Sequence, residues 1–268
     1  MSDTSGGQRE FVGRGMSRIF GAPISWIALF GALTGALSLV PMLFYPGGGG
    51  FISVGLVIFL PLAGLILGPG GGFLAGFIGG VIGMFISPAA YPLGFIDVFF
   101  MGAFAGLFYG LVHPRYRKFA IPFFIVNLIV MELVPYYIPG KAGGFDQMTN
   151  PLTYFFIYIW GPIGLLIYLF ALKPIFKAMG HPNLFIRMVV YILYVYMGLS
   201  QVFMPEGWIY MLVLHYPLSL SMISMTVTWV VLIPFAIAAG IVATFVIRAM
   251  EQTGLPHVIG SVLDREGY

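Results

Sequence analysis

Polar side chains inside long apolar runs are the residues of this 268-residue chain that are most able to bind a ligand. Glu132 lies in such a run, with six residues between it and Pro139, and Asn127 lies five positions earlier. Tyr136 follows Glu132 by four positions and therefore shares its helix face. Because polar groups inside a membrane are costly, they are functional candidates by default. We expect these three residues to bind a solute; the alternative is a protonated Glu132 that only forms a hydrogen bond between helices.

Four further residues are predicted to contribute to the same site. Asp97 begins an apolar run at its outer edge, and Tyr91 precedes it in a loop. Tyr158 and Trp160 lie in the outer half of a later run, which also contains Tyr154. Tyrosines near a membrane surface are common interfacial anchors, which is the alternative interpretation of Tyr91 and Tyr154.

The same inventory argues against an enzyme. The four histidines are scattered without metal-ligand spacing, no Ser/His/Asp grouping is visible, and the chain has no cysteine. The glycines around Gly68 lack the strand and acidic partner of a nucleotide-binding loop, and no Walker sequence is present. We therefore predict no catalytic residues, no metal and no cofactor. His215 is expected to be a packed or interfacial residue.

The elements that must position these residues are membrane helices. Sixty percent of the residues are apolar and only 8% are charged. The apolar runs are continuous and close to the ~20 residues that a bilayer core requires, which favours a helical bundle over a β-barrel. The expected fold class is all-α, a polytopic helical membrane protein in contact with lipid.

The expected organisation has four parts. Residues 1–20 form an N-terminal tail, residues 21–172 a six-helix core, residues 173–250 additional helices, and residues 251–268 a C-terminal tail. The core helices are expected over about 23–44, 51–67, 72–87, 95–112, 119–137 and 153–172, and a seventh over about 184–203. Residues 208–250 could form two spans, or one span preceded by a re-entrant or interfacial segment (208–225). We favour the latter, with eight spans in total.

The charge distribution predicts the orientation. Eleven of the twelve Lys and Arg residues can lie on one side of the membrane, leaving only Lys141 on the other. Such a bias marks the cytoplasmic side, so both termini are expected there, in a multi-pass protein of the cell membrane. The basic residues are scattered through short loops, so no nucleic-acid partner is expected. Acidic residues on the outer side favour cationic solutes only weakly.

Small residues recur at four-residue spacing in three runs. Two stripes consist of glycine (Gly72, Gly76 and Gly80; Gly102, Gly106 and Gly110), and a third of alanine (Ala28, Ala32 and Ala36). Small residues on one face let membrane helices approach closely. The glycine stripes are expected to pack within the chain, whereas the alanine stripe could also dock a separate membrane subunit.

The order of these motifs resembles the substrate-binding S components of energy-coupling factor (ECF) vitamin transporters. The alanine stripe is followed by a Gly-Pro turn into a glycine-rich helix (LGPGGGFLAGFIGGVIG, residues 67–83), a loop with Pro and Tyr (SPAAYP, residues 87–92) and the second glycine stripe. The resemblance covers about residues 22–172. It departs at Gly79-Gly80, where S components often carry Asp, and in the extension after Lys173.

The resemblance implies a high-affinity binding subunit that imports a small, vitamin-like or cationic metabolite through an ECF-type transporter. The outer halves of the later helices and the outer loops would form the pocket. The alanine stripe would meet the transmembrane coupling subunit, and partner chains would supply the ATPases. Two alternatives stay open: a stand-alone secondary transporter with Glu132 as its proton-coupling site, and a structural subunit of a larger membrane complex.

Overall fold

The computed structural model describes residues 17–45, 49–137, 159–214, 218–253 and 258–264. Near the N-terminus, β1 (Arg18–Ile19) pairs antiparallel with β2 (Ala22–Pro23), and α2 (Ile24–Ala36) follows. A 3₁₀ turn, η1 (Leu37–Leu39), leads into β3 (Pro41–Phe44), which pairs antiparallel with β4 (Phe51–Ser53).

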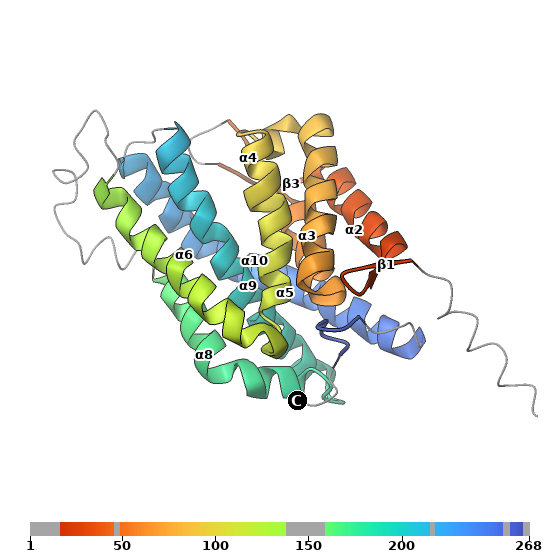
Figure 1. Ribbon diagram of the computed structural model, residues 1–268. Helices are drawn as coiled ribbons and strands as arrows, with labels where there is room; N and C mark the ends of the chain where they lie inside the picture. The colour runs from red at the N-terminus through yellow and green to blue at the C-terminus, as the bar shows by residue number, and fades with distance from the viewer. Residues whose placement is uncertain (1–16, 46–48, 138–158, 215–217, 254–257, 265–268) are drawn as a thin grey trace, which may run out of the picture.

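Helices make up nearly all of the rest of the described chain. They are η2 (Gly55–Phe59), α3 (Leu60–Ile86), η3 (Pro88–Ala90), α4 (Phe95–Asp97), η4 (Val98–Phe104), α5 (Ala105–Leu111), η5 (Pro114–Tyr116), α6 (Arg117–Tyr137), α8 (Trp160–Ala178), α9 (Leu184–Leu214) and α10 (Leu218–Thr253). Figure 1 shows α3 between α2 on one side and the continuous stretch α4–η4–α5 on the other.

Four helical stretches of the described chain are long and apolar enough to cross a membrane: Gly55–Ile86, Trp160–Ala178, Leu184–Pro205 and Thr226–Thr253. A fifth is added if Phe95–Leu111 and Pro114–Val130, which meet at an angle of 95°, are counted together. The predicted fold class, an all-α polytopic helical membrane protein, is confirmed.

The stretch Gly55–Ile86 is a helical hairpin rather than one straight helix. Gly68 has φ 69° and ψ −177°, a conformation outside the helical region, and Pro69 follows it. A Cβ placed on Gly72 would lie 2.8 Å from the Cα of Gly64, whereas positions eight apart in a straight helix are separated by ~12 Å. Residues 55–67 and 69–86 are therefore two arms that fold back on each other, and the predicted break between the second and third helices is confirmed.

The two glycine stripes pack against each other, which confirms the prediction that they pack within the chain. In an antiparallel arrangement, Gly76 of α3 faces Gly102 of η4, and Gly72 faces Gly106 of α5. A Cβ on Gly72 would lie 2.5 Å from the Gly106 carbonyl oxygen. Backbone contact this close requires that neither helix carries a side chain at the crossing.

The first predicted helix ends earlier than expected, and the prediction that it continues to Phe44 was wrong. Pro41 restricts the residue before it to extended conformations, and Val40 indeed has φ −99° and ψ 107°. The chain then enters the β3–β4 hairpin, whose paired strands satisfy their own main-chain groups. Because Phe51–Ser53 is part of this hairpin, the second predicted helix also begins later than expected.

The C-terminal helices also differ from the predicted bounds. Helix α9 continues past Phe203 and through Pro205 to Leu214, and α10 begins at Leu218. The predicted separate segment over residues 208–225 is therefore divided between the ends of two long helices. Pro is tolerated inside membrane helices because neighbouring helices can satisfy the backbone groups that it frees.

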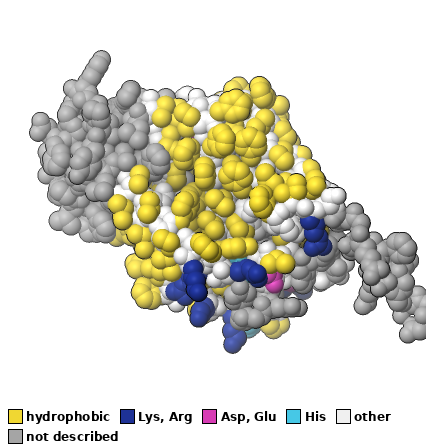
Figure 2. All heavy atoms as spheres, in the orientation of Figure 1, with side chains coloured by type: hydrophobic (Ala, Val, Ile, Leu, Met, Phe, Trp, Pro, Cys, Tyr) yellow, Lys and Arg dark blue, Asp and Glu magenta, His cyan; other side chains and the backbone are white. Residues whose placement is uncertain are grey.

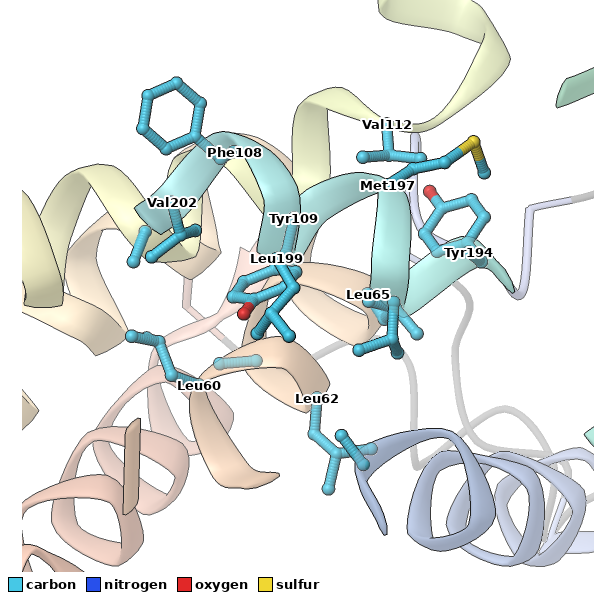
Figure 3. Packing of buried hydrophobic residues seen from close by; sticks show 14 of the residues in the cluster. Leu60, Leu62, Leu65, Phe108, Tyr109, Val112, Tyr194, Met197, Leu199 and Val202 are labelled. Atoms are coloured by element: carbon cyan, nitrogen blue, oxygen red, sulfur yellow. The ribbon is translucent and has the colours of Figure 1, made fainter. Parts of the chain in front are cut away.

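The core of the bundle lies where α3, α5 and α9 meet (Figure 3). Its labelled side chains are Leu60, Leu62 and Leu65 of α3, Phe108 and Tyr109 of α5 with Val112 just after it, and Tyr194, Met197, Leu199 and Val202 of α9. Tyr109 fits between two glycines of neighbouring helices: its Cβ lies 2.5 Å from the Cβ position of Gly64, and its ring covers Gly198.

Basic side chains gather at one end of the molecule, beyond a broad apolar band (Figure 2). Contacts between elements define this basic end. Pro69 in the α3 turn touches Gly110 of α5, and Phe20 covers Gly70 of α3. The His113 ring packs edge-on against the Phe176 ring of α8, with 4.6 Å between the ring centroids. The exposed basic residues of the described chain lie on these and adjoining segments: Arg18, Arg115, Lys118, Lys173, Lys177 and Arg248. The opposite, far end carries β3, β4, η3 and the start of α4.

Candidate functional site

A buried amide pair joins α6 to α9 inside the bundle. The Asn127 side chain is 8% exposed and donates from Nδ2 to the main-chain oxygen of Gln201 at 2.9 Å. The same nitrogen lies 3.5 Å from Gln201 Oε1. Gln201 is fully buried, and it lies ~26 Å along α9 from Leu184, within the candidate span Leu184–Pro205. Two amide groups are thus held at membrane depth, where unpaired polar groups are expensive.

Trp160 and Ser200 lie along the contact between α8 and α9. Trp160 is the first residue of α8 and is fully buried, and its indole N–H has no hydrogen-bond partner among the described residues. Ser200 Oγ donates to the Met197 oxygen at 2.9 Å and lies 3.5 Å from Gln201 Nε2. Its hydroxyl faces Gly164 of α8 in a close helix contact. Asn127, Trp160, Ser200 and Gln201 are called the buried polar group below.

Tyr91 and Asp97 lie in a second polar region, at the far end. The Tyr91 hydroxyl lies 3.3 Å from Ser38 Oγ, which donates to the Thr34 oxygen at 3.0 Å. Burial raises the pKa of Tyr91 to about 12, so the phenol keeps its proton. Asp97 is 2% exposed, and its Oδ2 accepts a hydrogen bond from the Leu93 N–H at 2.6 Å. This carboxylate stabilises the turn that starts α4.

The hydrogen bonds therefore divide the predicted site residues into two groups. Asn127 bonds to Gln201 of α9, and the main-chain oxygen of Trp160 accepts from Tyr196 of α9. In contrast, the Tyr91 hydroxyl lies beside Ser38 of η1, and Asp97 accepts from Leu93. Glu132 and Tyr136 lie in α6, but their side chains are outside the described residues. Tyr158 also lies outside the described residues. A solute pocket with the Glu132 carboxylate near its floor stays a prediction.

Gln201 and Ser200 were missed by the sequence analysis. The signal was present, because the pair forms a polar step in the apolar run of residues 184–203. This run belongs to the extension after Lys173, for which the family resemblance implies no role. The structure gives the extension a clear position: α9 contacts α3, α5, α6 and α8.

Arg187 is a second buried polar residue of this extension. Its guanidinium Nη2 donates to Glu251 Oε2 at 2.7 Å, which joins the start of α9 to the end of α10. The side chain is only 9% exposed, so it is held inside the basic end rather than extended into solvent. A buried charge of this kind requires a partner, and Glu251 supplies it.

Helix α2 has two chemically different faces. Its buried face carries Gly31 and Gly35, which pack on Ile78 and Ile82 of the second α3 arm. The predicted docking residues Ala28, Ala32 and Ala36 are all exposed. The chain therefore uses the glycine side of α2 for its own packing and leaves the alanine stripe on the surface.

Among the described residues, no group of three or more His, Asp or Glu side chains comes together in a way that could hold a metal ion. The polar region of α6, α8 and α9 instead presents neutral amide, hydroxyl and indole groups, whose chemistry is hydrogen bonding. The fold and site together define a polytopic helical membrane protein with polar groups buried between its helices. Comparison with known protein families, curated proteins and solved structures finds no match to this chain.

Proposed function

We propose that this chain is the solute-binding membrane subunit of an ECF-type importer, which captures a small metabolite and docks through α2 on a transmembrane coupling subunit. The observation that carries the proposal is the separation of the two faces of α2. Ala28, Ala32 and Ala36 remain exposed while the neighbouring glycines are used in internal packing.

An exposed alanine stripe is suited to a second membrane helix. Lipid gives no hydrophobic drive for helix association, so close backbone approach at small residues is what stabilises such contacts. The stripe runs over nine residues, from Ala28 to Ala36, or ~12 Å along the helix axis. It is flanked by large exposed side chains such as Leu29, which would surround a docked helix.

The buried polar group supports the solute-binding part of the proposal. Trp160 offers an indole N–H that is unpaired among the described residues, and Asn127 and Gln201 add amide groups that can donate and accept. These groups suit a solute with carbonyl, hydroxyl or carboxylate oxygens. Glu132, five residues after Asn127 in α6, would add preference for a cationic or amine-bearing group.

The distribution of charge supports an orientation for this function. All exposed basic residues of the described chain lie toward the basic end, which the positive-inside rule assigns to the cytoplasm. In the proposed arrangement, both termini are cytoplasmic and the solute enters from outside the cell membrane. ATPase subunits on the inner side would drive release.

Co-purification tests the proposed docking face. Ala32→Leu adds bulk to the alanine stripe without touching the internal packing, and Ala249→Leu makes the same change at an exposed position of α10. We expect the wild-type chain and Ala249→Leu to recover a coupling subunit and ATPases from native membranes, and Ala32→Leu to recover at least tenfold less. Absence of ATPase from the wild-type preparation, with proton-driven uptake by the chain alone in vesicles, would favour the secondary transporter.

A further inference from the structure

Residues 258–264 return to the bundle after α10 and pack into its basic end. Val258, Ser261, Val262 and Leu263 are each at most 5% exposed, whereas Ile259 between them is 60% exposed. The segment is the dark blue trace beside the lower ends of α3 and α5 in Figure 1. We call residues 258–264 the strap. It is part of the core, although the sequence predicts only a tail over residues 251–268.

The strap supplies a hydrogen bond that the α3 hairpin lacks. In an unbroken helix the Leu65 carbonyl would accept a hydrogen bond from residue 69, but residue 69 is proline and has no N–H. The Val262 N–H of the strap donates to the Leu65 oxygen instead, at 2.9 Å. The strap also lies directly over Gly68, whose Cβ position is 3.3 Å from the Gly260 oxygen.

The other side of the strap contacts the break between α5 and α6. His113 Nδ1 accepts the Arg115 N–H at 3.1 Å, so a neutral ring carries its proton on Nε2. Nε2 lies 3.4 Å from the Asp264 main-chain oxygen and can donate to it. Gly260, with φ +76°, lies against the Tyr116 ring, and its N–H donates to Asp264 Oδ2 at 2.8 Å.

We propose that the strap is a reversible latch that locks the Gly68 turn of α3 to the His113–Tyr116 segment. Both partners are backbone breaks at the basic end, and the strap spans them. When it undocks, the Leu65 carbonyl can be hydrated, because the basic end borders water. Undocking therefore leaves no main-chain group unpaired in lipid, and it frees the inner ends of α3 and α6 to move relative to each other.

Cysteine labelling tests this latch directly, because the natural chain contains no cysteine. Ser261→Cys places a thiol at a position that is 1% exposed, and Ile259→Cys places one at an exposed position of the same strap. We expect a water-soluble maleimide to label Ser261→Cys at least tenfold more slowly than Ile259→Cys in detergent-solubilised protein. Equal labelling rates would overturn the docked strap.

Two second-site variants test the contacts that hold the latch. Val262→Pro removes the N–H that donates to Leu65, and Gly260→Ala puts a side chain at φ +76° against Tyr116. Each should raise the labelling rate of Ser261→Cys about tenfold and leave that of Ile259→Cys unchanged. Unchanged protection of Ser261→Cys in both variants would show that these contacts do not hold the strap.

Hydrogen exchange tests whether the strap locks the two breaks together. In Val262→Pro, amide exchange should rise in residues 66–72 and 113–117, while residues 87–94 at the far end keep their wild-type protection. A strap that undocks without any change in residues 66–72 and 113–117 would contradict the locking function. A uniform rise over the whole chain would also contradict it, because it would indicate global destabilisation.

Discussion

The hydrogen bond from the Asn127 side chain to Gln201 crosses between α6 and α9 at membrane depth. Asn127 Nδ2 lies 2.9 Å from the main-chain oxygen of Gln201 and 3.5 Å from its side-chain Oε1, so the main-chain contact is the shorter one. Hydrogen bonds between membrane helices contribute ~0.6 kcal/mol on average and up to ~1.7 kcal/mol. The pair therefore fixes the register of two helices more than it determines the total stability.

Asn127→Leu should lower the free energy of unfolding by about 1–2 kcal/mol, because it removes the donor at nearly constant volume. Gln201→Leu should lower the free energy of unfolding by a smaller amount, because the main-chain oxygen that accepts from Asn127 stays in place. Steric trapping or denaturant unfolding in micelles measures both values. If Gln201→Leu lowers the free energy of unfolding more than Asn127→Leu does, the hydrogen bond to the Gln201 main-chain oxygen is not the dominant contact.

His113 should make stability depend on pH. Burial lowers its pKa from the ordinary 6.5 to about 4, with Asp264, Arg115 and Tyr116 as the ionisable groups facing it. A histidine whose folded pKa is depressed stabilises the fold above pH ~6.5, and this contribution is lost as the pH falls toward 4. At pH 5 the free energy of unfolding should be lower than at neutral pH by on the order of 1–2 kcal/mol.

Thermal unfolding between pH 7.5 and 5 measures this dependence. His113→Gln should flatten the pH profile, because the neutral amide cannot gain a proton. His181→Gln, at a half-buried loop position, is the matched control and should keep the wild-type slope. A steep profile in His113→Gln would assign the pH dependence to other groups.

At the scale of elements, the contact between α3 and α5 depends on backbone touching backbone. A Cβ on Gly106 would collide with the Gly72 carbonyl oxygen, which cannot move without shifting a helix. Gly106→Ala should therefore lower the free energy of unfolding by about 2–3 kcal/mol despite its better helix propensity. Ala32→Val, on the exposed face of α2, should change it by less than ~0.5 kcal/mol. Equal effects of the two variants would contradict the proposed packing.

The elements that could be predicted are those with local causes. Gly68-Pro69 is a strong helix breaker, and glycines at four-residue spacing indicate close packing, so the break and the packing of both stripes within the chain were predictable. The β3–β4 hairpin was not, because its strands are apolar and each main chain pairs with residues seven to twelve positions away. A short apolar run has the same sequence pattern whether it forms a buried helix or a strand.

The candidate site was predictable only in part, for the same reason. Asn127 and Trp160 were identified because they are polar or aromatic within apolar runs, and both are buried beside α9. Their partner Gln201 comes from a helix more than seventy residues away from Asn127, and nothing local specifies that approach. The strap was also not predictable, since its role depends on a carbonyl that Pro69 leaves without its helical donor.

At the scale of the whole molecule, the described chain begins and ends at the basic end. Phe20 and the strap both lie beside the α3 turn. Single cysteines at Lys177 and Ile259 should react with an impermeant maleimide only from the cytoplasmic side, and one at Ala89 only from outside. Reaction of Lys177→Cys and Ala89→Cys from the same side would exclude this topology.

Native mass spectrometry of the chain purified from its own membranes tests the central claim, solute capture at the buried polar group, most directly. We expect a small molecule bound to the wild-type protein and to the surface control Ala249→Leu. We expect that mass to be lost in Trp160→Phe and Asn127→Leu, with the fold intact by circular dichroism. A wild-type spectrum without any bound solute, or equal retention by all four proteins, would contradict it.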